Sequence, residues 1–231
     1  MLELFPQGFE ERDAVDGLEL AAYTDASGEE RLWAAFGRIS SEPVPAGWEE
    51  RWREFHRPIR IGPLWIGPPW ERPDRDLAVT IDPGRAFGTG GHATTRLCLE
   101  LLLELPPTSL LDVGCGSGVL ALAAAKMGFG PVIALDHDAA AVEAAMRNAE
   151  ANGVALDVRL RDALSDELPD AAVTVANITG ELIRALGPLF RSDAVIVSGY
   201  LEFDHPQLPE FVRVKRRATE GWAADLFRRE E

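Results

Sequence analysis

From about Thr94 onward, the sequence alternates between segments with the apolar spacing of a helix and short, continuously apolar segments typical of buried strands. Continuously apolar strands separated by helices are characteristic of a parallel sheet that helices cover on both faces. The alternation therefore predicts an α/β domain with a doubly wound, mostly parallel sheet. Helices are expected at residues 94–104, 118–127, 139–151 and 180–189, and strands at residues 109–113, 131–136, 156–162, 171–178 and 194–199.

The C-terminal tail departs from this alternation. Residues 212–217 and 222–229 both have strand patterns, and they flank the short segment 218–221 with no helix between them. Two strands joined by so short a segment pair in antiparallel fashion. We therefore expect an antiparallel C-terminal hairpin that closes one edge of the sheet.

The first 57 residues form a different, small α+β region, and it is too short to be stable alone. We place its boundary near Pro58, so that the α/β domain covers residues 58–231. Just after the boundary, two strands flank a proline-rich connector. The elements expected here are strands at residues 8–12 and 18–25, a weak strand at 38–41, helices at 29–36 and 48–55, and the two flanking strands at 59–66 and 77–81.

The charge balance bears on the partner. The chain has 23 Lys and Arg against 38 Asp and Glu, a net charge of -15, which repels phosphate backbones and favours a basic partner. We expect no direct nucleic-acid binding. Cys98 and Cys115 are the two cysteines, so neither a disulfide framework nor a zinc site is expected. The absence of a signal-peptide pattern and of a membrane-length apolar run predicts a cytoplasmic protein with no membrane contact.

A glycine-rich segment follows the first strand of the α/β domain. Gly114, Gly116 and Gly118 lead from LLDV into the helical segment VLALAAAKM. In doubly wound sheets such a loop lies at the carboxyl ends of the strands, where nucleotide-like ligands bind. The dinucleotide motif G-x-G-x-x-G requires its third glycine at position 119, which is Val119. This spacing favours S-adenosylmethionine over a dinucleotide, while a purely structural turn remains the alternative.

Acidic residues near this loop support the same cofactor. Asp112 precedes the glycines, where a carboxylate repels a pyrophosphate but accepts hydrogen bonds from the ammonium of a methionine moiety. Asp136 ends the second strand, 22 positions after Gly114, near the offset at which an acidic side chain binds ribose hydroxyls. Asp138 is expected to cap the next helix. For Asp162, contact with an adenine amino group and a solvated loop position are both open.

Asn177 is the candidate catalytic residue. It stands at the carboxyl end of the fourth strand, on the edge where the glycine loop and Asp136 are expected. Its amide oxygen can accept a hydrogen bond from an amine and direct the nitrogen lone pair at a methyl group. An aspartate there would instead hold the amine in its charged, unreactive form. The alternative for Asn177 is to cap the helix that begins near Gly180.

Several motifs together resemble one known family. The segments are DPGRAFGTGGHATT at 82–95, LLDVGCGSGVLA, LDHD, VANI and EGWAADLFRR, preceded by WEERWREFHRPIRIGPLWI. They resemble the bacterial methyltransferases of ribosomal large-subunit protein eleven, and the similarity spans roughly residues 48–231. The resemblance implies a class I, Rossmann-like, S-adenosylmethionine-dependent methyltransferase that acts on lysine side chains and an N-terminal α-amine of a protein. Family cofactor contacts match Thr95, Gly114, Asp136 and Asn177.

The resemblance also gives the glycine-rich segment 82–95 a role. In the family the FGTG loop folds over the cofactor, so Phe87 is expected to wall the methionine moiety while Gly88 lets the backbone close and open. His92 is expected either to contact substrate or to serve as a structural, hydrogen-bonded histidine. The alternative for Thr95 is to cap the following helix together with Thr94.

The N-terminal region differs from the family pattern. The family has a ferredoxin-like βαββαβ recognition domain and a linker helix, whereas this chain begins at what matches the second strand. Residues 1–57 are therefore expected to be a truncated form of that recognition region, which leaves the substrate open. Ribosomal protein eleven is the leading acceptor. The alternatives are a lysine of another protein, such as electron-transfer flavoprotein, a small molecule, and, outside this class, a nicotinamide-dependent oxidoreductase or a non-catalytic binding module.

Overall fold

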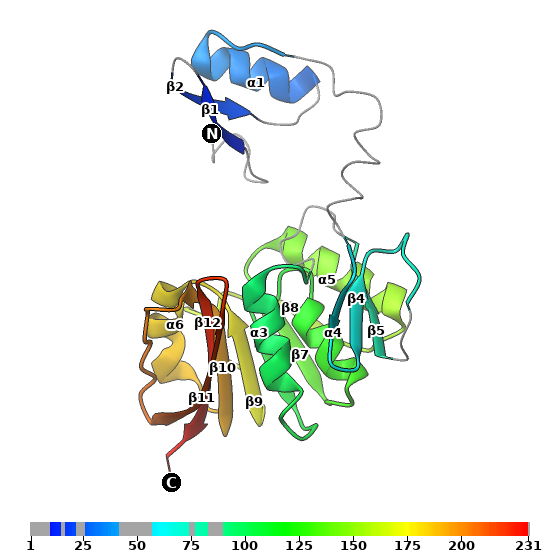
Figure 1. Cartoon of the computed structure of the whole chain (residues 1–231), viewed down its shortest axis with the longest axis vertical. Coiled ribbons are helices and arrows are strands. Elements are labelled where there is room, and N and C mark those ends of the chain that lie inside the picture. Colours follow the sequence, from blue (N-terminus) through cyan, green and yellow to red (C-terminus); the bar gives the residue numbers. More distant parts are fainter. Residues whose placement is uncertain are drawn as a thin grey trace. The chain divides into compact units, whose positions relative to one another are not determined.

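A computed structural model of the chain describes residues 10–14, 17–21, 26–41, 57–73, 77–82 and 90–230 (Figure 1). The chain divides into two compact units, Met1–Trp52 and Arg53–Glu231. The boundary expected from the sequence, near Pro58, lies a few residues further along the chain. The substrate-recognition role expected for the first unit stays a prediction.

The described part of the first unit is a hairpin followed by a helix. Strands β1 (Glu10–Ala14) and β2 (Gly17–Ala21) pair in antiparallel fashion, and α1 spans Ala26–Phe36. These elements agree with the strands and the first helix expected there. The weak strand expected at residues 38–41 is wrong, because this segment is irregular and mostly exposed and has no partner strand among the described residues. The helix expected at 48–55 lies outside the described residues.

The second unit is built on a seven-stranded sheet with the order β11-β12-β10-β9-β6-β7-β8. Five of its strands pair with one another in parallel, whereas β12 pairs in antiparallel fashion with both of its neighbours. The doubly wound sheet and its C-terminal hairpin are thus confirmed. The strands are β6 (Leu110–Val113), β7 (Val132–Asp136), β8 (Asp157–Leu160), β9 (Val173–Asn177), β10 (Ala194–Leu201), β11 (Phe211–Thr219) and β12 (Trp222–Arg229).

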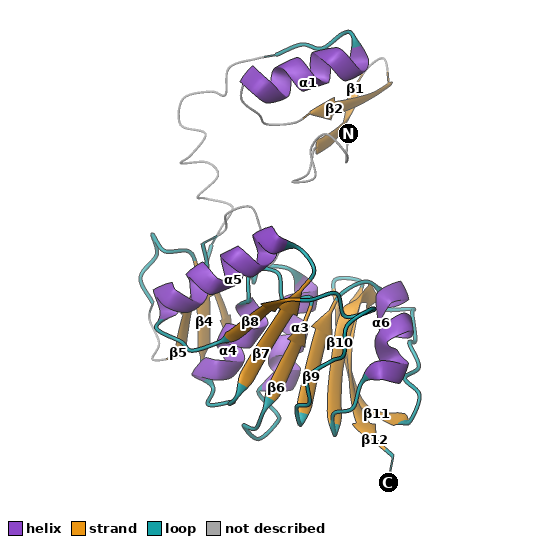
Figure 2. Ribbon diagram, turned by 180° about the vertical axis from the view of Figure 1, so that it is seen from behind, coloured by secondary structure: helices purple, strands orange, loops and turns teal. Residues whose placement is uncertain are grey.

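Helices pack on both faces of this sheet. On one face lie α3 (Ala93–Leu102), α4 (Val119–Lys126) and α5 (Ala139–Asn152). On the other lie α6 (Gly180–Leu186) and the 3-10 turn Gly187–Leu189. Figure 1 shows α3 and α4 in front of the sheet, and Figure 2, which views the molecule from behind, shows α6. Neighbouring strand residues alternate between the two apolar clusters, so Leu110 packs with the α3 side and Leu111 with the α6 side.

A small second sheet packs on the α3–α5 side. It consists of β3 (Ile59–Ile61), β4 (Leu64–Gly67) and β5 (Leu77–Thr80). The sequence predicts one strand over 59–66, which is wrong. Gly62 has a φ of 53° and is followed by Pro63, so the chain turns here and Ile61 pairs with Leu64 in a hairpin.

The topology determines where a ligand can bind. The chain runs outward from β6 to β7 and β8, and then returns to β9 on the other side of β6. In such sheets ligands bind at the carboxyl ends of the strands where this direction reverses. Asp112 in β6 is paired with Val175 in β9, and continuing this register places Gly114 level with Asn177. No helix in the described part of the chain has both the length and the apolar character needed to cross a membrane.

Candidate functional site

The glycine loop closes tightly over the ends of the neighbouring strands. The amides of Gly114 and Cys115 both donate to the carbonyl of Leu135 at the end of β7, at 2.9 Å. Gly114 has a φ of 72°, and a Cβ there would lie 2.5 Å from Cγ2 of Ile178. Only glycine combines this conformation with so close an approach. The loop then enters α4 through Gly118, the residue that precedes the helix.

Asp112 lies beneath this loop as a fully buried carboxylate. Its Oδ2 accepts a hydrogen bond from the amide of Ala121 at 3.1 Å, while its buried Oδ1 has no hydrogen-bond partner within the protein. Burial raises the pKa of Asp112 to about 7, and the negative charge of Asp136 adds to the effect. A buried acceptor without a partner is uncommon in folded proteins. Its chemistry fits a cationic donor such as an ammonium group.

Asp136 ends β7 and joins two turns. Its Oδ2 accepts from the amide of Gly116 at 2.9 Å, and its Oδ1 accepts from the amide of Asp138 at 3.0 Å. Asp138 in turn caps α5 by accepting from Ala140, as the sequence predicts. The Asp136 carboxylate therefore has a fixed orientation beside the glycine loop. Each carboxylate oxygen has a second lone pair that can accept from a ribose hydroxyl.

Asn177 is held by a residue from another element. Its Nδ2 donates to the hydroxyl of Thr95, in the first turn of α3, at 3.3 Å. Thr95 is buried, so the contact fixes the carboxamide at the end of β9. With Nδ2 engaged by Thr95, the oxygen at the other end of the carboxamide can accept from a ligand amine. Capping does not explain Asn177, because α6 is capped by Thr179, whose side chain accepts from Leu182.

The site lies in a segment of the chain with clear relatives. A family model described as ribosomal protein L11 methyltransferase (PrmA) matches residues 19–223. The chain belongs to the ribosomal protein L11 methyltransferase family. The ribosomal protein L11 methyltransferase of Vibrio campbellii is 47% identical over 152 residues, 63% of this chain and 51% of that protein. That of Symbiobacterium thermophilum is 45% identical over 196 residues, 78% of this chain and 64% of that protein.

A solved structure of this family has the same fold. The crystal structure of ribosomal protein L11 methylase from Lactobacillus delbrueckii subsp. bulgaricus aligns with a TM-score of 0.67 and 30% identity, covering 76% of this chain and all of that one. The class I methyltransferase fold expected from the sequence is thus confirmed. The chain spans about half to two thirds of the length of the two curated relatives above.

A methyltransferase of this fold needs a methyl donor, and the described residues fit S-adenosylmethionine. The unpartnered Oδ1 of Asp112 suits the ammonium of the methionine moiety. The lone pairs of the Asp136 carboxylate suit the ribose hydroxyls. Both carboxylates lie at or next to the carboxyl ends of adjacent strands. Among the described residues, no cluster of His, Cys, Asp and Glu is suited to a metal ion.

The other residues expected to bind the cofactor are Phe87, Gly88 and Asp162. Phe87 and Gly88 lie outside the described residues, so their role stays a prediction. Asp162 is exposed, and its Oδ1 accepts from the amide of Leu164 at 3.0 Å within its own loop. This contact suits the loop-acid alternative, while an adenine contact stays a prediction. Cys115 is buried, and burial raises its pKa, which keeps the thiol protonated and poorly nucleophilic.

His92 has the capping role that the sequence offers for Thr94 and Thr95. It precedes α3, and its Nδ1 accepts from the amide of Thr94 at 3.3 Å. Its ring also meets that of Trp222 edge-on, with centroids 4.9 Å apart. The capping alternative for Thr94 and Thr95 is therefore wrong, and both contacts of His92 fit the structural alternative. The hydroxyl of Thr95 accepts from Asn177 instead.

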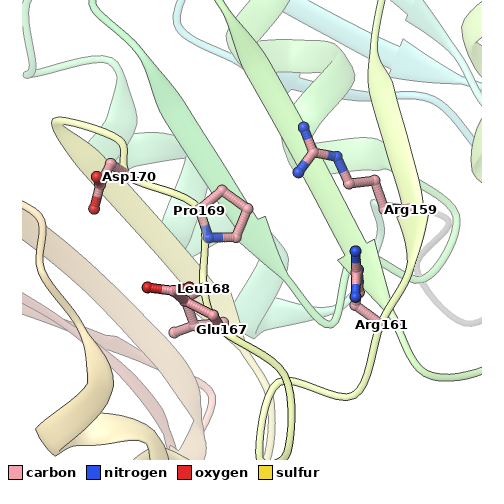
Figure 3. Close-up of a pocket in the computed structure, with 6 residues that line it drawn as sticks. All are labelled: Arg159, Arg161, Glu167, Leu168, Pro169 and Asp170. Atoms are coloured by element: carbon pink, nitrogen blue, oxygen red, sulfur yellow. The ribbon is translucent and has the colours of Figure 1, made fainter.

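Two cavities lie apart from these residues. One, of about 490 Å³, opens between β8 and the loop that leads to β9, with Arg159 and Arg161 on one side and Leu168 and Pro169 on the other (Figure 3). Another, of about 450 Å³, lies beside α3 and β11. No candidate cofactor residue lines either cavity.

Sequence reasoning missed two residues that shape the site, Ile178 and Gly199. Ile178 contacts the glycine loop, and Gly199 lies against the backbone of Ile178. A signal for Gly199 was present, because an isolated glycine within a strand often marks a bulge or a close backbone approach. No sequence signal points to Ile178, whose contacts depend on the pairing of three separate strands.

Proposed function

We propose that the chain transfers a methyl group from S-adenosylmethionine to amines of a protein, with lysines of ribosomal protein L11 as the leading acceptor. The observation that carries this proposal is the Asn177 carboxamide, which Thr95 orients at the strand end level with Gly114. Membership of the L11 methyltransferase family supports the same reaction and the same acceptor.

The chain's own residues would bind the donor and aim the acceptor. When bound, S-adenosylmethionine supplies a methyl carbon made electrophilic by its sulfonium. Asp112 would pair with the ammonium of the donor, and Asp136 would accept its ribose hydroxyls. The Asn177 oxygen would accept an N–H of the neutral lysine amine and direct the nitrogen lone pair at the methyl carbon. The new N–C bond forms as the S–C bond breaks, and the product amine releases its proton to water.

Magnitudes show that no dedicated base is needed. Deprotonating a lysine with a pKa of ~10.4 costs roughly 4–5 kcal/mol at neutral pH. Holding amine and methyl group in line contributes about 7–11 kcal/mol, so positioning is the larger effect. Partial desolvation and the nearby sulfonium charge lower the pKa of the amine further. An uncharged amide suits this task, because it does not stabilise the ammonium form.

The charge of the chain is consistent with a basic protein acceptor. Its net charge of -15 attracts lysine-rich segments and repels nucleic acid. We expect the acceptor to be a basic protein and the reaction to occur in the cytoplasm.

A labelling experiment tests the proposal. The purified chain is incubated with methyl-labelled S-adenosylmethionine and either purified ribosomal protein L11 or lysate from a strain that lacks the methyltransferase. We expect label on lysines of L11, identified by mass spectrometry, and loss of the label in the Asn177→Asp variant. Label on a different protein would replace L11 as the acceptor. Label confined to small metabolites would contradict protein methylation, and binding of reduced nicotinamide in place of the methyl donor would contradict the reaction class.

A further inference from the structure

Ile178 lies where three parts of the site meet. It directly follows Asn177 at the end of β9 and packs against the apolar cluster on the α6 face. Its amide donates to the carbonyl of Ser198 in β10 at 3.0 Å, which continues the pairing of Asn177 with Ser198. The position of Ile178 therefore depends on β10 as well as on β9.

One side of Ile178 rests on the glycine loop. Its Cγ2 occupies the space that a side chain at Gly114 would need, since a Cβ there would be only 2.5 Å away. Real carbon atoms without a bond between them do not approach so closely. The side chain of Ile178 therefore lies directly on the backbone of the loop expected to hold the methyl donor.

The other side of Ile178 is fixed by a bulge in β10. The pairing of β10 with β12 shifts between Ser198 and Tyr200, and the residue between them, Gly199, has a φ of 103°. A Cβ at Gly199 would lie 2.0 Å from the carbonyl oxygen of Ile178 and 2.7 Å from its carbonyl carbon. These are backbone atoms, so no change of rotamer would relieve the contact.

We propose that Ile178 is a positioning residue, held between Gly114 and Gly199, that fixes the Asn177 carboxamide relative to the methyl-donor loop. This inference rests on the proposed function, since it concerns how the methyl donor and the acceptor amine are aligned. Ile178 acts through Asn177, the residue before it, and through Gly114, the residue beneath it.

The physical reason is the sensitivity of transfer reactions to geometry. A misplacement of about 1 Å can lower a rate by about a hundred-fold, whereas binding of the donor alone tolerates more freedom. Packed interiors are nearly incompressible, so a residue in contact on two sides transmits a shift instead of absorbing it. A side chain added at Gly199 must therefore move Ile178, and Asn177 with it.

A double-mutant cycle tests the contact with the loop, with S-adenosylhomocysteine as the probe in calorimetry. Gly114→Ala should weaken its binding by about ten-fold or more, whereas Ile178→Ala alone should change it by less than about three-fold. The Gly114→Ala/Ile178→Ala pair should recover the part of the loss that comes from the clash with Cγ2, while the strain of alanine at a φ of 72° remains in both variants. If the pair binds as weakly as Gly114→Ala, the contact does not set the loop and the proposal fails.

The Gly199→Ala variant tests the link to Asn177. It should lower kcat by about ten-fold or more and change S-adenosylhomocysteine affinity by less than about three-fold, and it should shift the side-chain amide signal of Asn177 in ¹⁵N spectra. The control is Gly153→Ala, since Gly153 also has a positive φ, of 61°, but nothing lies within 4 Å of the added Cβ. The control should keep its kcat and its Asn177 signal.

Two results would overturn the proposal. One is an unmoved Asn177 signal in Gly199→Ala, and the other is an equal loss of kcat in Gly153→Ala. Should Gly199→Ala fail to fold, the Asn177 signal is compared between wild type and Ile178→Ala, which adds no atom to the packed interior, and an unmoved signal there would also overturn the proposal. The binding and spectroscopic measurements need no acceptor. A wild-type chain that methylates no protein would therefore contradict the proposed function while leaving these two measurements to judge the role of Ile178.

Discussion

The side-chain amide of Asn177 donates to the buried hydroxyl of Thr95 at 3.3 Å and so connects the end of β9 to the first turn of α3. These residues are 82 positions apart in the sequence. In this arrangement the Thr95 hydroxyl accepts from Nδ2, so the carboxamide oxygen is the end available to a ligand donor. Since an acceptor is what a neutral amine requires, Thr95 orients Asn177 for the proposed reaction.

Replacing Thr95 tests this orientation. Thr95→Val keeps the shape of the side chain and removes the hydroxyl, so the carboxamide loses its anchor. We expect kcat to fall by about five- to thirty-fold, in line with the loss of about 1–2 kcal/mol from one hydrogen bond. Thr95→Ser keeps the hydroxyl and is the control, with kcat within about three-fold of wild type. Equal rates for the valine and serine variants in a methylation assay would mean that the hydroxyl does not orient Asn177.

Asn177→Asp tests the need for a neutral acceptor. A carboxylate would raise the pKa of the bound lysine and hold it as ammonium. We expect kcat at neutral pH to fall by at least about ten-fold, with S-adenosylhomocysteine affinity within about three-fold of wild type. The residual activity of this variant should increase with pH only at a higher pH than the activity of the wild type does. Equal losses in kcat and in cofactor affinity would indicate that Asn177 has only a structural role.

Much of this site could be predicted from the sequence, because its residues follow strands whose apolar patterns are local signals. Gly114, Asp136 and Asn177 each come at or just after the end of a buried strand, and parallel strands bring their carboxyl ends to one edge. The bulge at Gly199 depends instead on how β10 pairs with β9 and β12, which no local pattern encodes. The capping role of His92 is also not encoded locally, because capping preferences favour Thr94 or Thr95 at this position.

The prediction of a single strand over residues 59–66 is wrong for a different reason. Residues on both sides of Gly62-Pro63 are mostly apolar, and a mostly apolar segment does not by itself reveal a break. The turn residues within the run carry the signal.

Asp112→Asn tests whether the buried carboxyl reduces stability. The pKa of Asp112 is raised in the folded state from 3.8 to about 7, so between these values the folded chain holds a proton that the unfolded chain has lost. The contribution of this group to the free energy of unfolding therefore falls as pH rises through that window. Each unit of raised pKa is worth about 1.4 kcal/mol.

We accordingly expect Asp112→Asn without cofactor to be more stable than wild type at pH 8, by about 1–3 kcal/mol, and to show little gain near pH 4. The same variant should bind S-adenosylhomocysteine more weakly, because the ammonium of the ligand loses the charged carboxylate of Asp112 as its partner. Thermal unfolding at the two pH values gives the difference, with Asp170→Asn, an exposed carboxylate, as the control. A variant that is less stable than wild type at pH 8 would contradict a cost of burying this charge.

Arg216 connects the C-terminal hairpin to the segment that follows β10, and its replacement should lower the stability of the chain. Arg216 Nη1 lies 3.0 Å from Oδ2 of the fully buried Asp225, and its Nη2 donates to the carbonyl of Asp204 at 2.8 Å. Breaking such a pair leaves a buried carboxylate without its main counter-charge, so Arg216→Met should cost about 2–4 kcal/mol. Arg217→Met, which removes ion pairs to Glu100 and Glu104 with solvent access, should cost only about 0–1 kcal/mol. Urea unfolding of both variants measures the difference, and equal losses would show that burial of Asp225 does not set the energy of the pair.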